Sequence, residues 1–443
     1  MASAAEQLAA NLNFGAFGKA TELKKRIWFT LGALIVYRLG TYIPLPGINL
    51  AALAQAFDQQ QSGILGLFNM FAGGAVGRMA IFALGIMPYI SASIIVQLMT
   101  SIVPSLEALK KEGEAGRKKI NQYTRYGTVL LAIVQAYGIA VSLESSSNIV
   151  MDPGPMFKLS ATITLVGGTM FLMWLGEQIT SRGIGNGISL IIFSGIVAGL
   201  PRALAGTLEL GRQGALATPI IIGMLVVAVI VIAFIVFVER AQRRLLIQYP
   251  KRQVGNRLFQ GESSHLPLKL NTSGVIPPIF ASSLLLVPAT LSGFTGQGGS
   301  GILQTITTLL GHGQPLYMLL YAALIVFFAF FYTAIVFNPT DTADNLKKHG
   351  GFIPGYRPGE RTAQYIDYVL TRITVLGAIY LVLVCLLPEF LISATGVPFY
   401  FGGTSLLIVV SVTMDTVAQV QGHLLAHQYE GLVKKAKLRG KKR

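Results

Sequence analysis

The chain has 443 residues, of which 52% are hydrophobic and only 12% are charged, and its net charge is +16. Soluble domains carry about 25% charged residues, so this composition excludes a soluble globular class and indicates a membrane protein. The single cysteine, Cys385, excludes a disulfide within the chain. The basic charge fits nucleic-acid binding, attraction to anionic lipid, or the excess of Lys and Arg in cytoplasmic membrane loops.

A transmembrane helix needs about 20 mostly apolar residues, and backbone groups inside lipid must pair within the segment. The first apolar run follows Lys24, Lys25 and Arg26 and ends in the sequence PLPG with no small-residue cleavage site, so we interpret it as a transmembrane helix rather than a signal peptide. Ten such helices are predicted, at 24–43, 79–101, 122–142, 156–176, 184–201, 217–238, 273–291, 315–337, 370–391 and 398–420.

The stretch GILGLFNMFAGGAVG, Gly63–Gly77, differs from these segments. It is too short to span a membrane and too rich in glycine for a stable isolated helix. It is either an external loop or a re-entrant segment buried in the protein, and its Phe68, Met70 and Phe71 favour burial.

The basic residues lie mostly on one side of the predicted topology. With the N-terminus in the cytosol, thirty of the 35 Lys and Arg residues fall in cytosolic segments. The other five are Arg38, Arg78, Lys158, Arg202 and Arg212. This asymmetry predicts cytosolic termini and explains most of the net charge without nucleic acid, and the tail KKAKLRGKKR would also attract anionic lipid.

Two cytosolic loops, 239–272 and 338–369, are longer than connectors need to be, and loops of this length are usually functional or disordered. Both are rich in basic residues, so we expect the functional machinery to face the cytosol.

Catalytic motifs are absent from the sequence. There is no HExxH, GxSxG or GxxxxGK[ST] pattern, so we expect no enzyme activity. The glycine-rich stretch 183–187 follows no predicted strand, which disfavours a nucleotide site. His423 and His427 lie four residues apart, and we interpret them as interfacial residues rather than metal ligands.

Ionisable residues are nearly absent from the middle of the predicted helices. A transporter for a small solute would need convergent polar or charged groups there, and a membrane-embedded enzyme would need a catalytic pair. Neither is found, so both classes are disfavoured alternatives.

Two helices carry a polar stripe interrupted by isoleucine. The residues at i, i+4, i+7 and i+11 share one face of a helix. They are Ile86, Ile90, Ser93 and Gln97 in the second span, and Thr404, Ile408, Ser411 and Asp415 in the last. The stripes are either ordinary helix packing or the wall of a wet funnel narrowed by isoleucines, a constriction that can exclude ions by dewetting.

Several long stretches resemble the SecY family of bacteria. They are IPLPGI (43–48), LGIMPYISASIIVQLM (84–99), EGEAGRKKINQYTRYG (112–127), RGIGNGISLIIFSGI (182–196), HLPLKLNTSGVIPPIFASS (265–283), FFYTAIVFNPTDTADNLKKHGGFIPGYRPGE (330–360) and PFYFGGTSLLIVV (398–410). The resemblance covers nearly the whole chain from about residue 22. One departure is Pro277-Pro278, where many relatives have Pro-Ala.

The resemblance implies an all-α polytopic membrane protein with ten transmembrane helices in two pseudo-symmetric five-helix halves. The implied parts are a cytosolic segment 1–22, an N-terminal half 23–216, a C-terminal half 217–421 and a basic tail 422–443. The implied function is a channel that passes unfolded secretory proteins across the bacterial inner membrane. It also releases transmembrane segments sideways through a gate between spans 2–3 and 7–8.

The resemblance also implies roles for particular residues. The pore ring consists of Ile86, Ile90, Ile192, Ile279 and Ile408. The plug, about 61–77, includes Leu65, Phe68, Asn69, Met70, Phe71, Gly73 and Gly74. Partner docking falls to the loop arginines Arg243, Arg244, Arg252, Arg257 and Arg357.

The implied partners are SecE and SecG in a heterotrimer, the SecA ATPase, and the ribosome with its nascent chain. They further include the signal-recognition-particle receptor, SecDF, YidC, signal peptides and anionic phospholipids. No cofactor and no metal is implied, and energy for transport comes from the partners.

Overall fold

The computed structural model describes residues 21–60, 69, 72–145, 149–214, 217–250, 252–254, 257–259, 263–295, 314–395 and 403–440. It divides into two compact units, which we describe separately. The first unit comprises Met1–Ala205, Val287–Thr307 and Val412–Arg443, and the second comprises Gly206–Leu286 and Thr308–Ser411.

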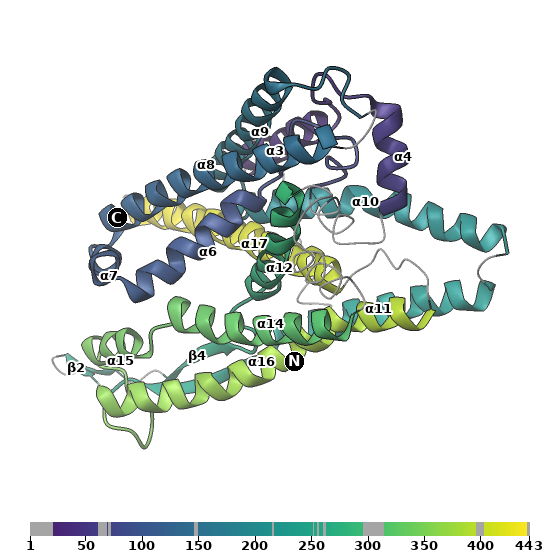
Figure 1. Cartoon of the computed structure of the whole chain (residues 1–443). Coiled ribbons are helices and arrows are strands. Elements are labelled where there is room, and N and C mark those ends of the chain that lie inside the picture. The colour runs from purple at the N-terminus through teal and green to yellow at the C-terminus, as the bar shows by residue number, and fades with distance from the viewer. Residues whose placement is uncertain are drawn as a thin grey trace. The chain divides into compact units, whose positions relative to one another are not determined.

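Helices dominate the described residues (Figure 1). Those in the first part of the chain are α3 (Thr21–Gly40), α4 (Leu50–Gln60), α6 (Met87–Ile102), α7 (Pro104–Lys111), α8 (Glu114–Ser145), α9 (Pro155–Arg182) and α10 (Gly187–Arg212). Those that follow are α11 (Thr218–Arg240), α12 (Ile276–Thr295), α14 (Pro315–Val336), α15 (Pro339–Lys348), α16 (Glu360–Thr395) and α17 (Gly403–Gly440). Within the described residues, seven helices are long and apolar enough to cross a membrane, or eight if the bent pair α6–α7 counts as one span.

The predicted all-α polytopic class is therefore confirmed, and each of the ten predicted segments overlaps a helix, although several helices begin or end inside the predicted bounds. α3 and α12 are not among the membrane-crossing helices by length and composition. In α3 the charged residues at both ends leave a short apolar stretch, and in α12 the apolar helix counted is only Ile276–Leu285.

The second predicted span begins later than expected. Residues 81–86 form turns, and the helix starts at Met87 rather than at residue 79. Gly85 and Met79 have positive φ angles of 56° and 40°, which a continuous right-handed helix does not allow. At its other end α6 breaks at Val103, and α7 starts with Pro104 at an angle of 97°, because the residue before a proline avoids the helical region.

In the first unit, α8 and α9 lie side by side and antiparallel (Figure 1). Ion pairs join them at both ends. Arg125 binds both carboxylate oxygens of Glu177, with N···O distances of 2.9 and 2.7 Å, and Lys158 lies 2.8 Å from Glu144. The bidentate arginine pair is the stronger type of contact because its planar fork matches a carboxylate.

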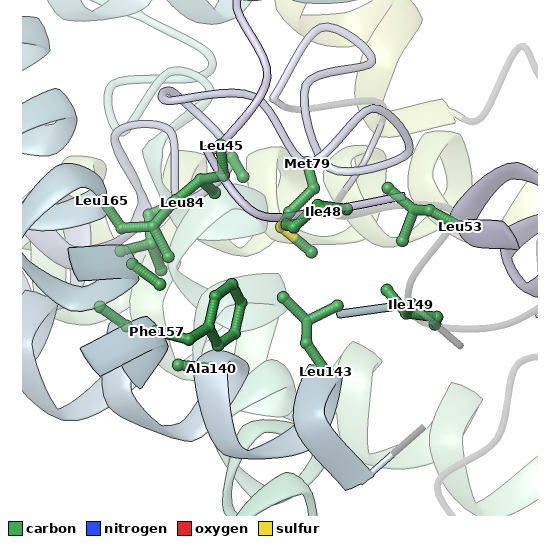
Figure 2. Close-up of a cluster of buried hydrophobic side chains, with 13 residues drawn as sticks. Leu45, Ile48, Leu53, Met79, Leu84, Ala140, Leu143, Ile149, Phe157 and Leu165 are labelled. Carbon is green, nitrogen blue, oxygen red and sulfur yellow. The ribbon is translucent and has the colours of Figure 1, made fainter. Parts of the chain in front are cut away.

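The core beside this pair joins segments that are far apart in the sequence (Figure 2). Phe157 and Leu165 from α9 pack with Leu143 from α8 and with Ile48 and Leu84 from the two connecting segments. Backbone hydrogen bonds hold the connections in place, from Asn49 to the Ile149 carbonyl (2.8 Å) and from Leu45 to the Met79 carbonyl (2.9 Å). The segment that follows α3 is therefore hydrogen-bonded to the two segments that contain Met79 and Ile149.

In the second unit, the first long loop, 239–272, folds into a β-structure that its sequence did not lead us to expect. Strand β1 (Gln242–Gln248) pairs antiparallel with β4 (Ser263–Lys269), and the short strands β2 (Arg252–Val254) and β3 (Arg257–Phe259) pair with each other. Residues alternate along β1, with Leu245 and Ile247 buried between exposed neighbours. This alternation is the period of a strand with one buried face.

The second long loop packs against this hairpin. The backbones of Gln248 and Phe352 exchange two hydrogen bonds, of 2.9 and 3.0 Å. Beneath them a buried cluster combines both loops with the first half of α16 and consists of Leu245, Leu268, Ile353, Ile366, Val369 and Ile373. The two loops and α16 therefore form one packed body.

Candidate channel-lining and docking residues

The five predicted ring isoleucines all lie on or beside helices and are buried, with exposed fractions of 5% for Ile86, 6% for Ile90, 6% for Ile192, 8% for Ile279 and 0% for Ile408. Ile86 precedes the first helical residue of α6, and its carbonyl accepts the first helical hydrogen bond from Ile90 at 3.1 Å. The first three belong to the first unit and the other two to the second. The ring as an assembly remains a prediction.

The two polar stripes contain buried oxygen atoms without a protein partner. Among the described residues, Gln97 Oε1 on α6 and Ser411 Oγ on α17 are buried and accept or donate no hydrogen bond, whereas the Gln97 amide nitrogen donates to Ser93 Oγ at 3.3 Å. Buried polar groups in folded proteins are almost always satisfied by protein or by water. Gln135 Oε1 and Tyr380 Oη, which lie on neither stripe, are buried and unpartnered as well, so this property alone does not mark a wall that faces water.

A polar cavity lies at the inner end of the stripe on α17. It has a volume of about 480 Å³ and is lined by Asn186, Ser189, Val412, Asp415, Thr416, Ala418 and Gln419, all in the first unit. Asp415 is exposed and lies near the middle of the candidate span Thr404–Ala426.

The plug candidate is described only in part, since Leu65, Phe68, Met70 and Phe71 lie outside the described residues. Asn69 closes the turn that follows it. Its side-chain oxygen accepts a hydrogen bond from the Gly77 backbone at 2.8 Å, and its carbonyl accepts one from Gly74 at 2.7 Å. Ala75 and Val76 are buried at 0% and 5% exposure, which favours the re-entrant interpretation over an external loop for this part.

Two of the five basic residues outside the predicted cytosolic segments bind the carbonyl of Gly73. Arg38 donates to it at 2.8 Å and Arg78 at 3.3 Å, and both guanidinium groups lie over the ring of Tyr42. Gly73 has a φ of +66°, and a methyl group there would come within 3.0 Å of the Gly195 Cα. Only glycine fits this position without strain.

The glycine-rich stretch 183–187 is a structural junction. Three of its backbone N–H groups donate hydrogen bonds to side-chain oxygens. The Ile184 N–H donates to Thr30 Oγ1 (3.1 Å), that of Gly185 to Gln419 Oε1 (2.8 Å) and that of Gly187 to Thr180 Oγ1 (2.9 Å). A phosphate-binding loop presents such groups to its ligand. Here they tie α3, α9 and α17 together, which explains the motif without a nucleotide.

The predicted docking arginines belong to the packed body formed by the two long loops. Arg243 and Arg244 are exposed on β1, and Arg357 is exposed in the segment before α16. Arg252 and Arg257 lie on β2 and β3, but their side chains fall outside the described residues. In β1 the apolar residues Leu245, Leu246 and Ile247 are consecutive, so the alternating burial of the strand is not visible in its sequence.

Metal ligands do not cluster in the part of the chain that the structure describes, where no group of three or more His, Cys, Asp or Glu side chains could hold an ion. His423 is exposed, and the His427 side chain lies outside the described residues. Cys385 is buried.

The fold is that of membrane translocation channels. A solved SecY structure, reported for a plug domain that stabilises its closed state and maintains a membrane seal, superimposes with a TM-score of 0.67 at 19% identity, over 90% of this chain and 92% of that one. Sec61 from the canine ribosome–channel complex of the endoplasmic reticulum gives 0.62 at 18% identity, over 90% and 92%.

Sequence comparison assigns the family. The SecY family model matches residues 80–417. The protein translocase subunit SecY of Vibrio cholerae is 59% identical over 95% of this chain and 96% of its own length. The chain therefore belongs to the SecY family and is a multi-pass membrane protein.

Proposed function

We propose that this chain is the protein-conducting channel of a bacterial translocase and that unfolded chains pass it along the two polar stripes. The observation that carries the proposal is that each stripe holds a polar side chain, Gln97 on α6 or Ser411 on α17, on the same helix face as a buried isoleucine. Each lies within two turns of a buried isoleucine, Ile90 or Ile408. A wet wall with a dry, apolar constriction suits a path that admits polypeptide and restrains ions.

The isoleucines at positions 86, 90, 192, 279 and 408 form the constriction in this proposal. Stiff β-branched side chains contact a passing chain without polar groups that would select one sequence. Segment 61–77 is the plug, and its fixed end is the Gly73 carbonyl bound by Arg38 and Arg78.

The lateral release of a transmembrane segment follows from its partition between water and lipid. A sufficiently apolar segment gains about 25 cal/mol per Å² of apolar surface by leaving water, so it moves from the wet path into lipid when the wall opens. We assign this gate to the helices of spans 2–3 and 7–8 of two five-helix halves, 23–216 and 217–421. One boundary between the two compact units, near residue 205, lies close to the boundary of these halves, whereas residues 287–307 and 412–443 belong to the first unit.

The packed body formed by the two cytosolic loops is the proposed docking surface. The exposed cations Arg243, Arg244 and Arg357 suit acidic or phosphate-rich partners. The ribosome is the first partner we propose, because the Sec61 neighbour comes from a ribosome–channel complex. SecA, the signal-recognition-particle receptor, SecE, SecG, SecDF and YidC are the further partners we propose, with the bacterial inner membrane as location and both termini in the cytosol.

Single-channel conductance of the purified complex in planar bilayers tests the pore assignment. Deleting residues 65–74 should raise ion leak only partly, because the constriction remains. Replacing Ile86, Ile90 and Ile408 by serine in the deleted background should raise it much further, because a polar ring hydrates. A matched triple replacement of the lipid-exposed Val229, Ile230 and Phe237 on α11 should add nothing. Conductance unchanged by the ring replacement would show that these isoleucines do not line the pore.

A further inference from the structure

The start of α12 is held by a buried polar contact that the sequence analysis did not single out. The side chain of Asn271, 4% exposed, donates to Glu239 Oε1 at 2.7 Å and to the Gly274 carbonyl at 3.1 Å. Its own oxygen accepts a hydrogen bond from Ser273 Oγ at 3.0 Å. Both amide hydrogens and the amide oxygen are thus used, which is nearly the full capacity of an asparagine.

The contact joins three elements of the second unit. Glu239 ends α11, Asn271 begins the turn after β4, and a methyl group on Gly377 of α16 would meet the Leu270 carbonyl at 2.7 Å. Gly274 has a φ of +62°, the left-handed conformation that turns the chain into α12. The direction of α12 is therefore set where α11 and α16 meet this turn.

α12 depends on this external support because of its own sequence. Pro277 and Pro278 stand in its first turn and have no N–H groups. The predicted ring residue Ile279 follows directly, and its carbonyl accepts hydrogen bonds from both Ser282 (2.9 Å) and Ser283 (2.8 Å).

We propose that Glu239 and Asn271 are positioning residues that hold the inner end of α12, and with it Ile279, in the closed arrangement of the channel. The inference rests on the proposed function, in which Ile279 lines the pore and α12 belongs to the gate. Weakening the contact frees α12 and lowers the requirement for a strong signal sequence.

A charge exchange tests the contact itself. Asn271→Asp places two carboxylates face to face and repels α12 from Glu239. Glu239→Gln combined with Asn271→Asp restores one hydrogen bond with donor and acceptor exchanged, at the original net charge. Thr272→Asp is the matched control, because it adds the same charge one residue away, where the threonine hydroxyl only caps the Lys269 carbonyl.

The measurement is export into membrane vesicles containing the full complex. The readout is export of a precursor with a shortened apolar signal divided by export of the same precursor with an intact signal. A purely structural loss lowers both and leaves this ratio unchanged. We expect Asn271→Asp to raise the ratio about fivefold or more, the range of energetic coupling between sites. The exchanged pair should return it to within about twofold of the wild type, and Thr272→Asp should leave it unchanged.

A normal ratio in Asn271→Asp at normal abundance overturns the proposal, as does an exchanged pair no better than the single variant. If Asn271→Asp does not accumulate, Asn271→Ser shortens the side chain without adding charge, and a wild-type ratio there overturns the proposal equally. Ile279→Ser tests the ring assignment independently of the Asn271–Glu239 contact. If it raises the ratio while the Asn271 variants do not, the contact is rejected and the ring assignment stands. If neither Ile279→Ser nor the Asn271 variants change the ratio, both the contact and the ring assignment fail.

Discussion

At the scale of single residues, the charges outside the cytosolic segments have local uses. Arg38 and Arg78 bind the Gly73 carbonyl, Lys158 pairs with Glu144, and Arg212 lies 3.1 Å from Glu209. The side chain of Arg202, the fifth, lies outside the described residues. Four of the five exceptions to the charge asymmetry thus make specific local contacts. We therefore keep the predicted orientation, which rests on the other thirty basic residues.

Neighbouring glycines on α9 provide a test at the same scale. A methyl group on Gly168 would collide with the backbone carbonyl of Ile81, whereas one on Gly167 would meet nothing. Gly→Ala in an open helical position stabilises by about 0.5–1 kcal/mol, so Gly167→Ala should be neutral or slightly stabilising. Gly168→Ala should destabilise by about 1–3 kcal/mol through overpacking. Thermal unfolding of the purified protein in detergent measures both, and equal midpoints would contradict this close packing.

At the scale of elements, apolar length predicted where helices lie but not how they start or bend. The helices at 122–142 and 156–176 were predictable because long apolar runs have few alternatives in lipid. The late start of α6 was not, since it depends on positive φ angles at Met79 and Gly85. The β1–β4 hairpin was hidden because its basic residues dominated the interpretation of the loop and its buried face has only a short alternating pattern.

The hairpin provides an element-scale prediction from two adjacent leucines. Leu245 is 5% exposed in the cluster beneath both cytosolic loops, and Leu246 is 39% exposed. Leu245→Ala should destabilise the packed loops by about 2–5 kcal/mol and weaken ribosome binding. Leu246→Ala should leave binding near the wild-type level. Cosedimentation of the purified complex with ribosomes measures the difference. Equal binding by both variants would show that ribosome docking does not depend on the packing of these loops.

The exposed arginine of the second loop gives another element-scale prediction. Arg357→Glu should block SecA-driven export while the protein still inserts, because an exposed loop charge contributes to docking rather than to the core. ATP-dependent export into membrane vesicles at low and high salt is the assay. Wild-type export at both salt concentrations would remove this loop from the SecA site.

At the scale of the whole molecule, composition and charge predicted the class, and family motifs predicted the function. Thirty cytosolic Lys and Arg residues against five elsewhere predict that both termini lie in the cytosol. A reporter that is active only outside the cytosol, fused after Arg443, should therefore be silent. Activity of this fusion would overturn either the number of spans or the orientation.

The site was predictable residue by residue but not as an assembly. Ile86, Ile90 and Ile408 could be selected from their spacing with polar residues, whereas Ile192 and Ile279 came only from the family resemblance. The Asn271–Glu239 contact could not be predicted from the sequence, because it joins residues 32 positions apart through a turn that no local pattern specifies.

Cross-linking a stalled secretory chain tests the central claim most directly. In a Cys385→Ala background, which removes the only cysteine, single cysteines replace each of the five isoleucines in turn, and Val229 on α11, 65% exposed, serves as the control. If the chain conducts unfolded polypeptide past these residues, a cysteine in the translocating segment should form disulfides with all five positions and not with position 229. Cross-links at position 229 as strong as those at the isoleucines, or none at the isoleucines, would contradict the account.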